Sequence, residues 1–153
     1  MTQHSLQESS YLLHHLTTVL DRQSDKLLMN NFGLGFSQFK ILMALKSEEG
    51  VAQKKVAANL DQTEASISRQ INLMQKVGLL TSRTTPENRR QHVTKLTAKG
   101  NRIADKAVDL LESFYGPLFH GLSQEDRQQL HQTLEILHSE ACSHHQTLHS
   151  STK

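Results

Sequence analysis

Residues 51–100 have the sequence VAQKKVAANLDQTEASISRQINLMQKVGLLTSRTTPENRRQHVTKLTAKG. Apolar residues recur at helical spacing in the first part of this stretch, which predicts a short helix over 53–59 and a longer helix after it. The longer helix is expected to bury Ile67, Ile71 and Met74, with Leu73 and Val77 beside them. The first half of the stretch is therefore typical of a helix-turn-helix.

The ends of the second helix carry their own signals. Either Asp61 or Thr63 can cap its N-terminus, and we favour Thr63; Gly78 supplies a left-handed stop at the other end. The outer face is predicted to hold polar residues, namely Glu64, Ser66, Arg69, Gln70 and Asn72.

A hairpin is expected directly after this helix. Residues 79–84 and 92–96 have strand character, and a polar loop with the sequence PENRR at 86–90 separates them. Two short helices followed by a basic hairpin can bind a DNA duplex, because the second helix fits the major groove while the hairpin reaches the neighbouring backbone or minor groove.

Charge is strongly segregated along the chain. Residues 53–106 contain eleven Lys and Arg against four acidic residues, a net charge of +7, whereas the rest of the chain has a net charge of −5. A basic centre between acidic flanks is the electrostatic pattern of a module that binds a polyanion. The pattern favours double-stranded DNA as the partner.

Long amphipathic helices are predicted on both sides of this centre. The first covers about 12–28, is broken at 30–35 and is followed by a helix that Ser37 caps and that ends near 49–50. Thr97 is expected to cap a long helix, which Gly116-Pro117 should end. Ser123 and Asp126 are expected to begin a last helix, which should fray from about residue 145.

Composition limits the class of protein. The chain has 153 residues, of which 36% are hydrophobic and 21% charged, so a mainly α-helical fold of one domain is expected. The N-terminal residues lack the basic start and continuous apolar run of a signal peptide, so we expect no export signal and no membrane span, and the single cysteine, Cys142, excludes an intrachain disulfide. We expect a cytoplasmic protein with no membrane partner.

Several motifs taken together resemble the MarR family of winged helix-turn-helix transcription regulators. They are ASISR at 65–69, VGLL at 77–80, Arg83, PENRR at 86–90 and KLTAKG at 95–100. The resemblance covers essentially the whole chain and implies a ligand-released repressor that binds a pseudo-palindromic site as a homodimer. It divides residues 1–153 into a DNA-binding lobe at 36–100 and dimerisation helices at 5–30 and 101–145.

The DNA-binding residues that these patterns predict lie on the second helix and the wing. They are Thr63, Ser66, Ser68, Arg69, Gln70, Arg83, Arg89 and Arg90. Arg69 is the expected reader of guanine, and the resemblance implies that Arg90 enters the minor groove. Asn88 departs from the family, which usually has an aspartate there that braces the wing arginine, so Arg89 shares the expected role.

Dimerisation also follows from the apolar faces. The amphipathic helices at the two ends of the chain carry more apolar surface than a small winged lobe can cover. An intramolecular bundle is the alternative; we favour a homodimer.

The regulatory signal leaves alternatives open. A small organic effector is implied by the resemblance, although the sequence does not identify its binding residues; Phe32, Phe36, Phe39, Met43, Phe114 and Tyr115 are candidates for lining its site. His138, Cys142 and His145 share one helix face at a spacing that could hold a metal, so a metal- or redox-responsive regulator is an alternative. A further alternative is an interaction adaptor that does not bind DNA. We expect no metal and no cofactor.

An enzyme is not expected. The sequence has no phosphate-binding glycine loop, nucleophile elbow or His-Glu metal motif.

Overall fold

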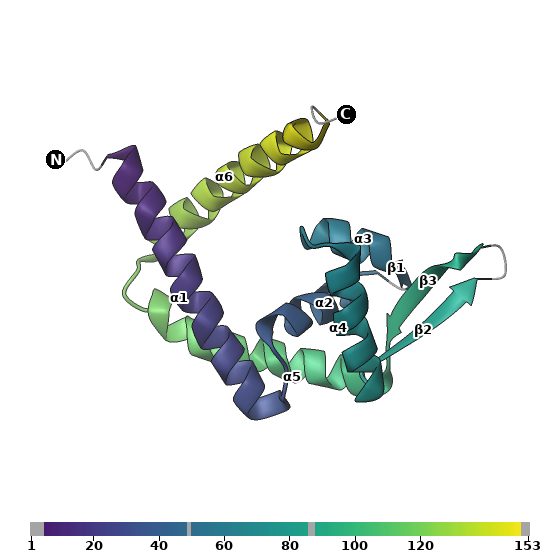
Figure 1. The fold of residues 1–153 in the computed structure, drawn as a ribbon. Coiled ribbons are helices and arrows are strands. Elements are labelled where there is room, and N and C mark those ends of the chain that lie inside the picture. The colour runs from purple at the N-terminus through teal and green to yellow at the C-terminus, as the bar shows by residue number, and fades with distance from the viewer. Residues whose placement is uncertain (1–4, 49, 86–87, 151–153) are drawn as a thin grey trace. The chain divides into compact units, whose positions relative to one another are not determined.

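The computed structural model describes residues 5–48, 50–85 and 88–150, with the side chains of 85, 88–92 and 142–150 outside the description. The elements, in chain order, are α1 (Leu6–Phe32), α2 (Phe36–Lys46), β1 (Val51–Ala52), α3 (Gln53–Asn59), α4 (Glu64–Lys76), β2 (Leu80–Thr85), β3 (Asn88–Leu96), α5 (Ala98–Tyr115), the 3-10 helix η1 (Gly116–Phe119) and α6 (Gln124–Ser150) (Figure 1). The chain is mainly α-helical with a small antiparallel sheet, and the predicted fold class, a winged helix-turn-helix, is confirmed.

The chain forms two compact units, Met1–Leu111 and Glu112–Lys153. The first holds α1 through most of α5, including the sheet; the second holds the last turn of α5, η1 and α6. The division into a DNA-binding lobe and dimerisation helices stays a prediction.

Helix α1 is longer than its apolar pattern indicated. Ser5 caps it, because the Ser5 hydroxyl accepts the Glu8 backbone N–H at 3.2 Å and the Glu8 carboxylate accepts the Ser5 N–H at 2.8 Å. The predicted break at 30–35 was wrong by three residues: the helix continues to Phe32 and ends at Gly33, whose φ of 65° is left-handed.

The N-cap of helix α2 lies two residues before the predicted one. Ser37 was wrong as the N-cap; Gly35 occupies that position, and the Phe36 N–H donates to Asp25 Oδ1 of α1 at 2.8 Å. The predicted end near 49–50 was also too late, since α2 ends at Lys46. The contact with Asp25 is tertiary, so the local sequence did not indicate it.

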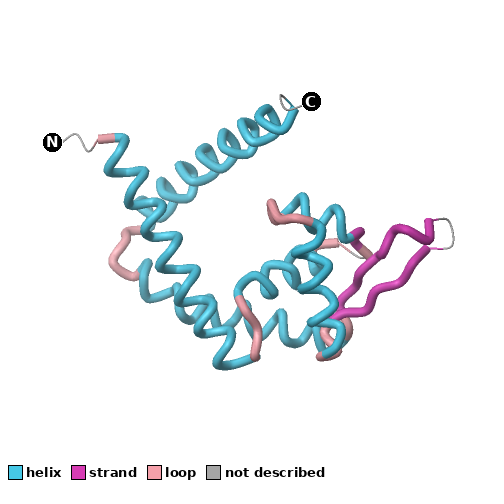
Figure 2. Tube along the Cα trace, viewed as in Figure 1, coloured by secondary structure: helices cyan, strands magenta, loops and turns pink. Residues whose placement is uncertain are grey.

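The sheet has three strands rather than the predicted two, in the order β1-β3-β2 (Figure 2). Strands β2 and β3 pair antiparallel as the hairpin, which projects beyond the helices of its unit (Figure 2). Strand β1 was missed, because two residues are too short for a periodic pattern; Val51 pairs with Thr94 and Ala52 with Val93. Strand β3 also begins earlier than expected, at Asn88 rather than near residue 92.

The core of the first unit lies between the helix-turn-helix, the sheet and α5. Its fully buried members include Ile41, Leu42, Val56, Ile67, Ile71, Met74 and Ala104. Thr97 caps α5 as predicted, accepting the Gly100 N–H at 2.9 Å. A Cβ at Gly100 would lie 2.1 Å from the Leu79 carbonyl oxygen, so only glycine permits this approach between α5 and the end of the helix-turn-helix.

The second unit consists of η1 and α6 with the end of α5. Gly116-Pro117 ends α5 as predicted. Ser123 and Asp126 form the predicted cap of α6: the Ser123 hydroxyl and N–H donate to the Asp126 carboxylate, which lowers the pKa of that carboxyl. The expectation of fraying from residue 145 was wrong, since the backbone is helical to Ser150. None of the helices in the described part of the chain has the length and apolar character of a membrane span.

Candidate nucleic-acid interface

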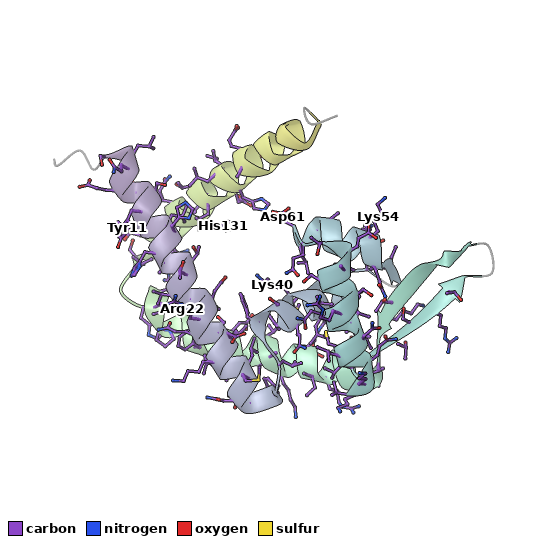
Figure 3. The ribbon with its side chains drawn as sticks, viewed as in Figure 1. Tyr11, Arg22, Lys40, Lys54, Asp61 and His131 are labelled. Atoms are coloured by element: carbon purple, nitrogen blue, oxygen red, sulfur yellow. The ribbon has the colours of Figure 1, made fainter. Side chains whose placement is uncertain are left out.

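The candidate recognition helix is α4, and one side of it is buried in the core of the first unit. Ile67, Ile71 and Met74 are fully buried, and this spacing leaves the opposite side of the helix to solvent. Thr63 is the N-cap, as favoured: its hydroxyl oxygen accepts the Ser66 N–H at 3.1 Å. Asp61 lies in the turn before α4 with a left-handed φ of 51°, a conformation that aspartate tolerates (Figure 3).

The exposed side of α4 differs from the predicted outer face. Arg69 and Asn72 are exposed as expected, and Arg69 makes no ion pair among the residues whose side chains are described. Leu73 and Val77 were wrongly assigned to the core, because they are 46% and 54% exposed. Helical rotation explains the error, since Leu73 follows Arg69 by one turn and must share its side of the helix.

Two predicted contact residues are engaged within the protein. Gln70 is half-buried, and its side-chain oxygen accepts a hydrogen bond from Gln38 Nε2 of α2 at 3.1 Å. Ser66 is also half-buried, and its hydroxyl donates to Gln62 Oε1 at 3.4 Å. Ser68 is half-buried on the flank of the helix. The structure thus brings Thr63, Ser66, Ser68, Arg69 and Gln70 onto one helix but presents them unequally.

The wing carries the remaining predicted residues. Arg83 is exposed on β2, where its Cα pairs with that of Val93 on β3. The backbone of Arg89 and Arg90 belongs to β3, while their side chains lie outside the described part of the structure. Ser82 and Thr94 join the two strands through hydroxyl groups 3.2 Å apart, which supports the base of the wing.

Other cations surround the helix-turn-helix. Lys54 on α3 and Lys76 on α4 are exposed, while Lys55 forms an ion pair with Glu48 at 2.6 Å. Lys99 Nζ donates to the Val77 carbonyl at 2.7 Å, at the C-terminal end of α4 where a cation is favourable. Figure 3 labels Lys54, on α3, and Asp61, in the turn before α4. Sequence reasoning left Lys54 and Lys76 out of the predicted site, although the net charge of the segment included them.

A pocket of about 300 Å³ lies between α1 and α2. It is lined by Asp21, Arg22, Asp25, Phe36, Ser37 and Lys40. Lys40 Nζ stands 5.0 Å from the centre of the Phe36 ring, a cation–π distance. Phe36 is the only one of the residues considered for an effector site that lines this pocket.

The histidine and cysteine cluster is only partly described. His138 lies on α6, whereas the side chains of Cys142 and His145 lie outside the described residues. Among the side chains that are described, no three His, Cys, Asp or Glu residues group as a metal site would require.

Comparison with known proteins supports a single family. Residues 32–91 match the sequence model of the MarR family. The chain is 26% identical over 127 residues to the organic hydroperoxide resistance transcriptional regulator of Bacillus subtilis, which covers 83% of this chain and 84% of the relative.

Solved structures share the fold. A MarR family protein from Bacillus stearothermophilus superposes with a TM-score of 0.80 at 18% identity, over 93% of this chain and 99% of that one. S. aureus MepR, in a structure of its complex with DNA, superposes with a TM-score of 0.75 at 20% identity, over 86% and 96% of the two chains. The matched segment, residues 32–91, holds the helix-turn-helix and the first strand of the wing, so this part of the chain is similar to the MarR family.

Proposed function

We propose that this DNA-binding transcriptional regulator is a sequence-specific repressor that acts in the cytoplasm as a homodimer on a pseudo-palindromic site. The observation that carries the proposal is the solvent-facing side of α4, where Arg69 is exposed on a helix anchored by Ile67 and Ile71. Two such helices related by a twofold axis would enter successive major grooves about one helical turn apart.

Each predicted residue except Gln70, which is bonded to Gln38 of α2, has a role in this proposal. Arg69 reads a guanine edge, and Thr63 and Ser68 donate to phosphates around the start of α4; Ser66 joins them by exchanging its hydroxyl bond to Gln62 for one to a phosphate. Arg83 contacts the backbone from β2, and Arg89 and Arg90 reach the minor groove from the wing. The lobe at 36–100 makes these contacts, and the helices at 5–30 and 101–145 join the two subunits.

Replacing Arg69 by alanine is expected to weaken specific binding by about 1 to 3 kcal/mol, or roughly 5- to 150-fold, because a guanidinium that bonds guanine in two places would be lost. The fold should not change, since Arg69 is exposed. A gel-shift titration against the upstream region of the protein's own gene measures the change.

Arg22→Ala is the matched control, because it removes the same charge from α1, outside the helix-turn-helix (Figure 3). It should leave the affinity for DNA unchanged in the absence of an effector. Equal affinities for the wild type and Arg69→Ala, with circular dichroism unchanged, would show that α4 is the wrong surface.

Homodimerisation is supported by apolar side chains that the isolated chain leaves exposed. On α1 these include Leu12 and Leu16, at 63% and 54%; on α6 they include Leu130, Leu134 and Leu137, at 39%, 42% and 49%. The α6 residues recur at four and three positions, which forms one stripe on the helix. Apolar stripes of this length are usually covered by a partner.

Release from DNA is proposed to follow the binding of a small organic effector. The pocket between α1 and α2 supports this, because the Phe36 ring and the cations Arg22 and Lys40 would suit an aromatic acid. The effector must favour the DNA-incompetent arrangement, and a shift from 1:99 to 99:1 needs roughly 5.5 kcal/mol of differential affinity.

The double variant Cys142→Ser, His138→Ala is expected to keep both its affinity for DNA and its response to the inducing condition, because the proposed effector does not use the histidine and cysteine cluster. Operator release is measured by gel shift with and without the inducer. Normal DNA binding combined with loss of every response would replace the organic effector with metal or redox sensing.

A further inference from the structure

We infer that Asn72, and not Gln70, is the side chain of α4 that reads an adenine, and that it does so beside Arg69. The inference rests on the proposed function, because it names which base the proposed recognition helix selects. It separates two amide side chains that stand two residues apart, of which the sequence patterns predict Gln70, and not Asn72, to be a DNA-binding residue.

Gln70 is poorly placed to read a base. It is half-buried against α2, and its side-chain oxygen already accepts a hydrogen bond from Gln38 Nε2 at 3.1 Å. Readout of adenine needs both ends of an amide at once: the oxygen accepts from the N6 amino group while the nitrogen donates to N7. Using Gln70 for this purpose would disturb its bond to α2.

Asn72 is free for the same chemistry. Its side chain is exposed and makes no hydrogen bond to any other residue in the described part of the structure. It follows Arg69 by three positions, so the two side chains lie on the same side of α4. Because the helix rises 1.5 Å per residue, they are about 4.5 Å apart along its axis, close to the ~3.4 Å step between stacked bases.

The exposed side chain of Leu73, next to Asn72, also favours an A·T pair. Leu73 is 46% exposed, whereas Ile67 and Ile71 on the same helix are fully buried. In the major groove an A·T pair presents the adenine edge together with the thymine methyl group, and apolar side chains contact that methyl. Neighbouring amide and leucine side chains therefore match an A·T pair next to the guanine that Arg69 reads.

The test selects bound sequences from a library of duplexes whose two half-sites are randomised, using the full-length wild type, Asn72→Ala and Gln70→Ala. The wild type should select an adenine next to a guanine in each half-site. Asn72→Ala should lose the adenine preference at that one position by roughly 5- to 150-fold, the range of about 1 to 3 kcal/mol for a two-bond contact, while keeping the guanine.

Gln70→Ala is the matched control, because it removes the other amide from the same helix. It should keep the adenine preference of the wild type even where overall affinity falls. In a second measurement, replacing the paired thymine by uracil removes only the methyl group; it should weaken binding by the wild type but not by Leu73→Ala.

The outcomes separate this inference from the function on which it rests. If the wild type selects no sequence at all, the proposed function fails. If the wild type selects a sequence and Asn72→Ala selects the same one, or if Gln70→Ala is the variant that loses the adenine, only the inference fails. Thermal melting of both variants checks that the fold is retained.

Discussion

Specific binding to operator DNA is expected to weaken by about 10³- to 10⁵-fold when the salt concentration rises from about 50 to about 200 mM. The reason is the release of counterions: each phosphate that a cation neutralises frees condensed ions from the duplex, and added salt opposes that release. An effect this large requires about six to ten phosphate contacts.

The lobe has enough cations for that number. Besides Arg69, which reads a guanine in the proposal, the helix-turn-helix and β2 expose Lys54, Lys76 and Arg83 without an ion pair among the described side chains, so two subunits supply six cations. Lys55 is less available, since Glu48 pairs with it at 2.6 Å.

Fluorescence anisotropy of a labelled operator across a salt series measures the slope of log affinity against log salt. Lys76→Ala should reduce the magnitude of that slope by about 1 for each subunit, because one phosphate contact is lost, and the reduction should be the same for every duplex sequence. A nearly flat dependence for the wild type would contradict electrostatic binding through this lobe.

Leu134→Asp is expected to abolish most of the dimer and with it most of the DNA affinity. Leu134 is 42% exposed in the single chain, so an aspartate there should not unfold the protein by itself. In the proposed dimer the same carboxylate would be buried without a partner, which costs several kcal/mol. The substitution should therefore weaken the association of the two subunits and leave the folding of each chain unchanged.

Gln132→Asp provides the control, because it adds the same charge to α6 on the side away from the stripe of Leu130, Leu134 and Leu137. Light scattering should report twice the chain mass for the wild type and for Gln132→Asp, and close to one chain mass for Leu134→Asp. A Leu134→Asp monomer that still binds operator tightly would show that the second subunit is not needed.

Much of the fold could be predicted from local patterns. Thr63, Thr97 and Ser123 were identified as caps, and Gly78 as a left-handed stop, because each acts through backbone groups only a few residues away. The helix over 53–59 was also correct. These features depend on bonds whose partners adjoin them in the sequence.

The incorrect predictions concern features that depend on contacts with residues far away in the sequence. Gly35 caps α2 next to a bond between Phe36 and Asp25, eleven residues apart, and β1 exists because Val51 finds Thr94 on β3. Helical periodicity alone also placed Leu73 in the core, since it cannot fix how far the buried stripe extends around a helix.

The sequence by itself determined that this chain has a basic helix-turn-helix with a wing, because charge, caps and apolar spacing are properties of neighbouring residues. Only the tertiary structure decided which side chains of α4 are available to DNA. The packing of α2 against α4 engages Gln70 through Gln38 and leaves Asn72 exposed, and such a contact between residues 32 positions apart has no local signal.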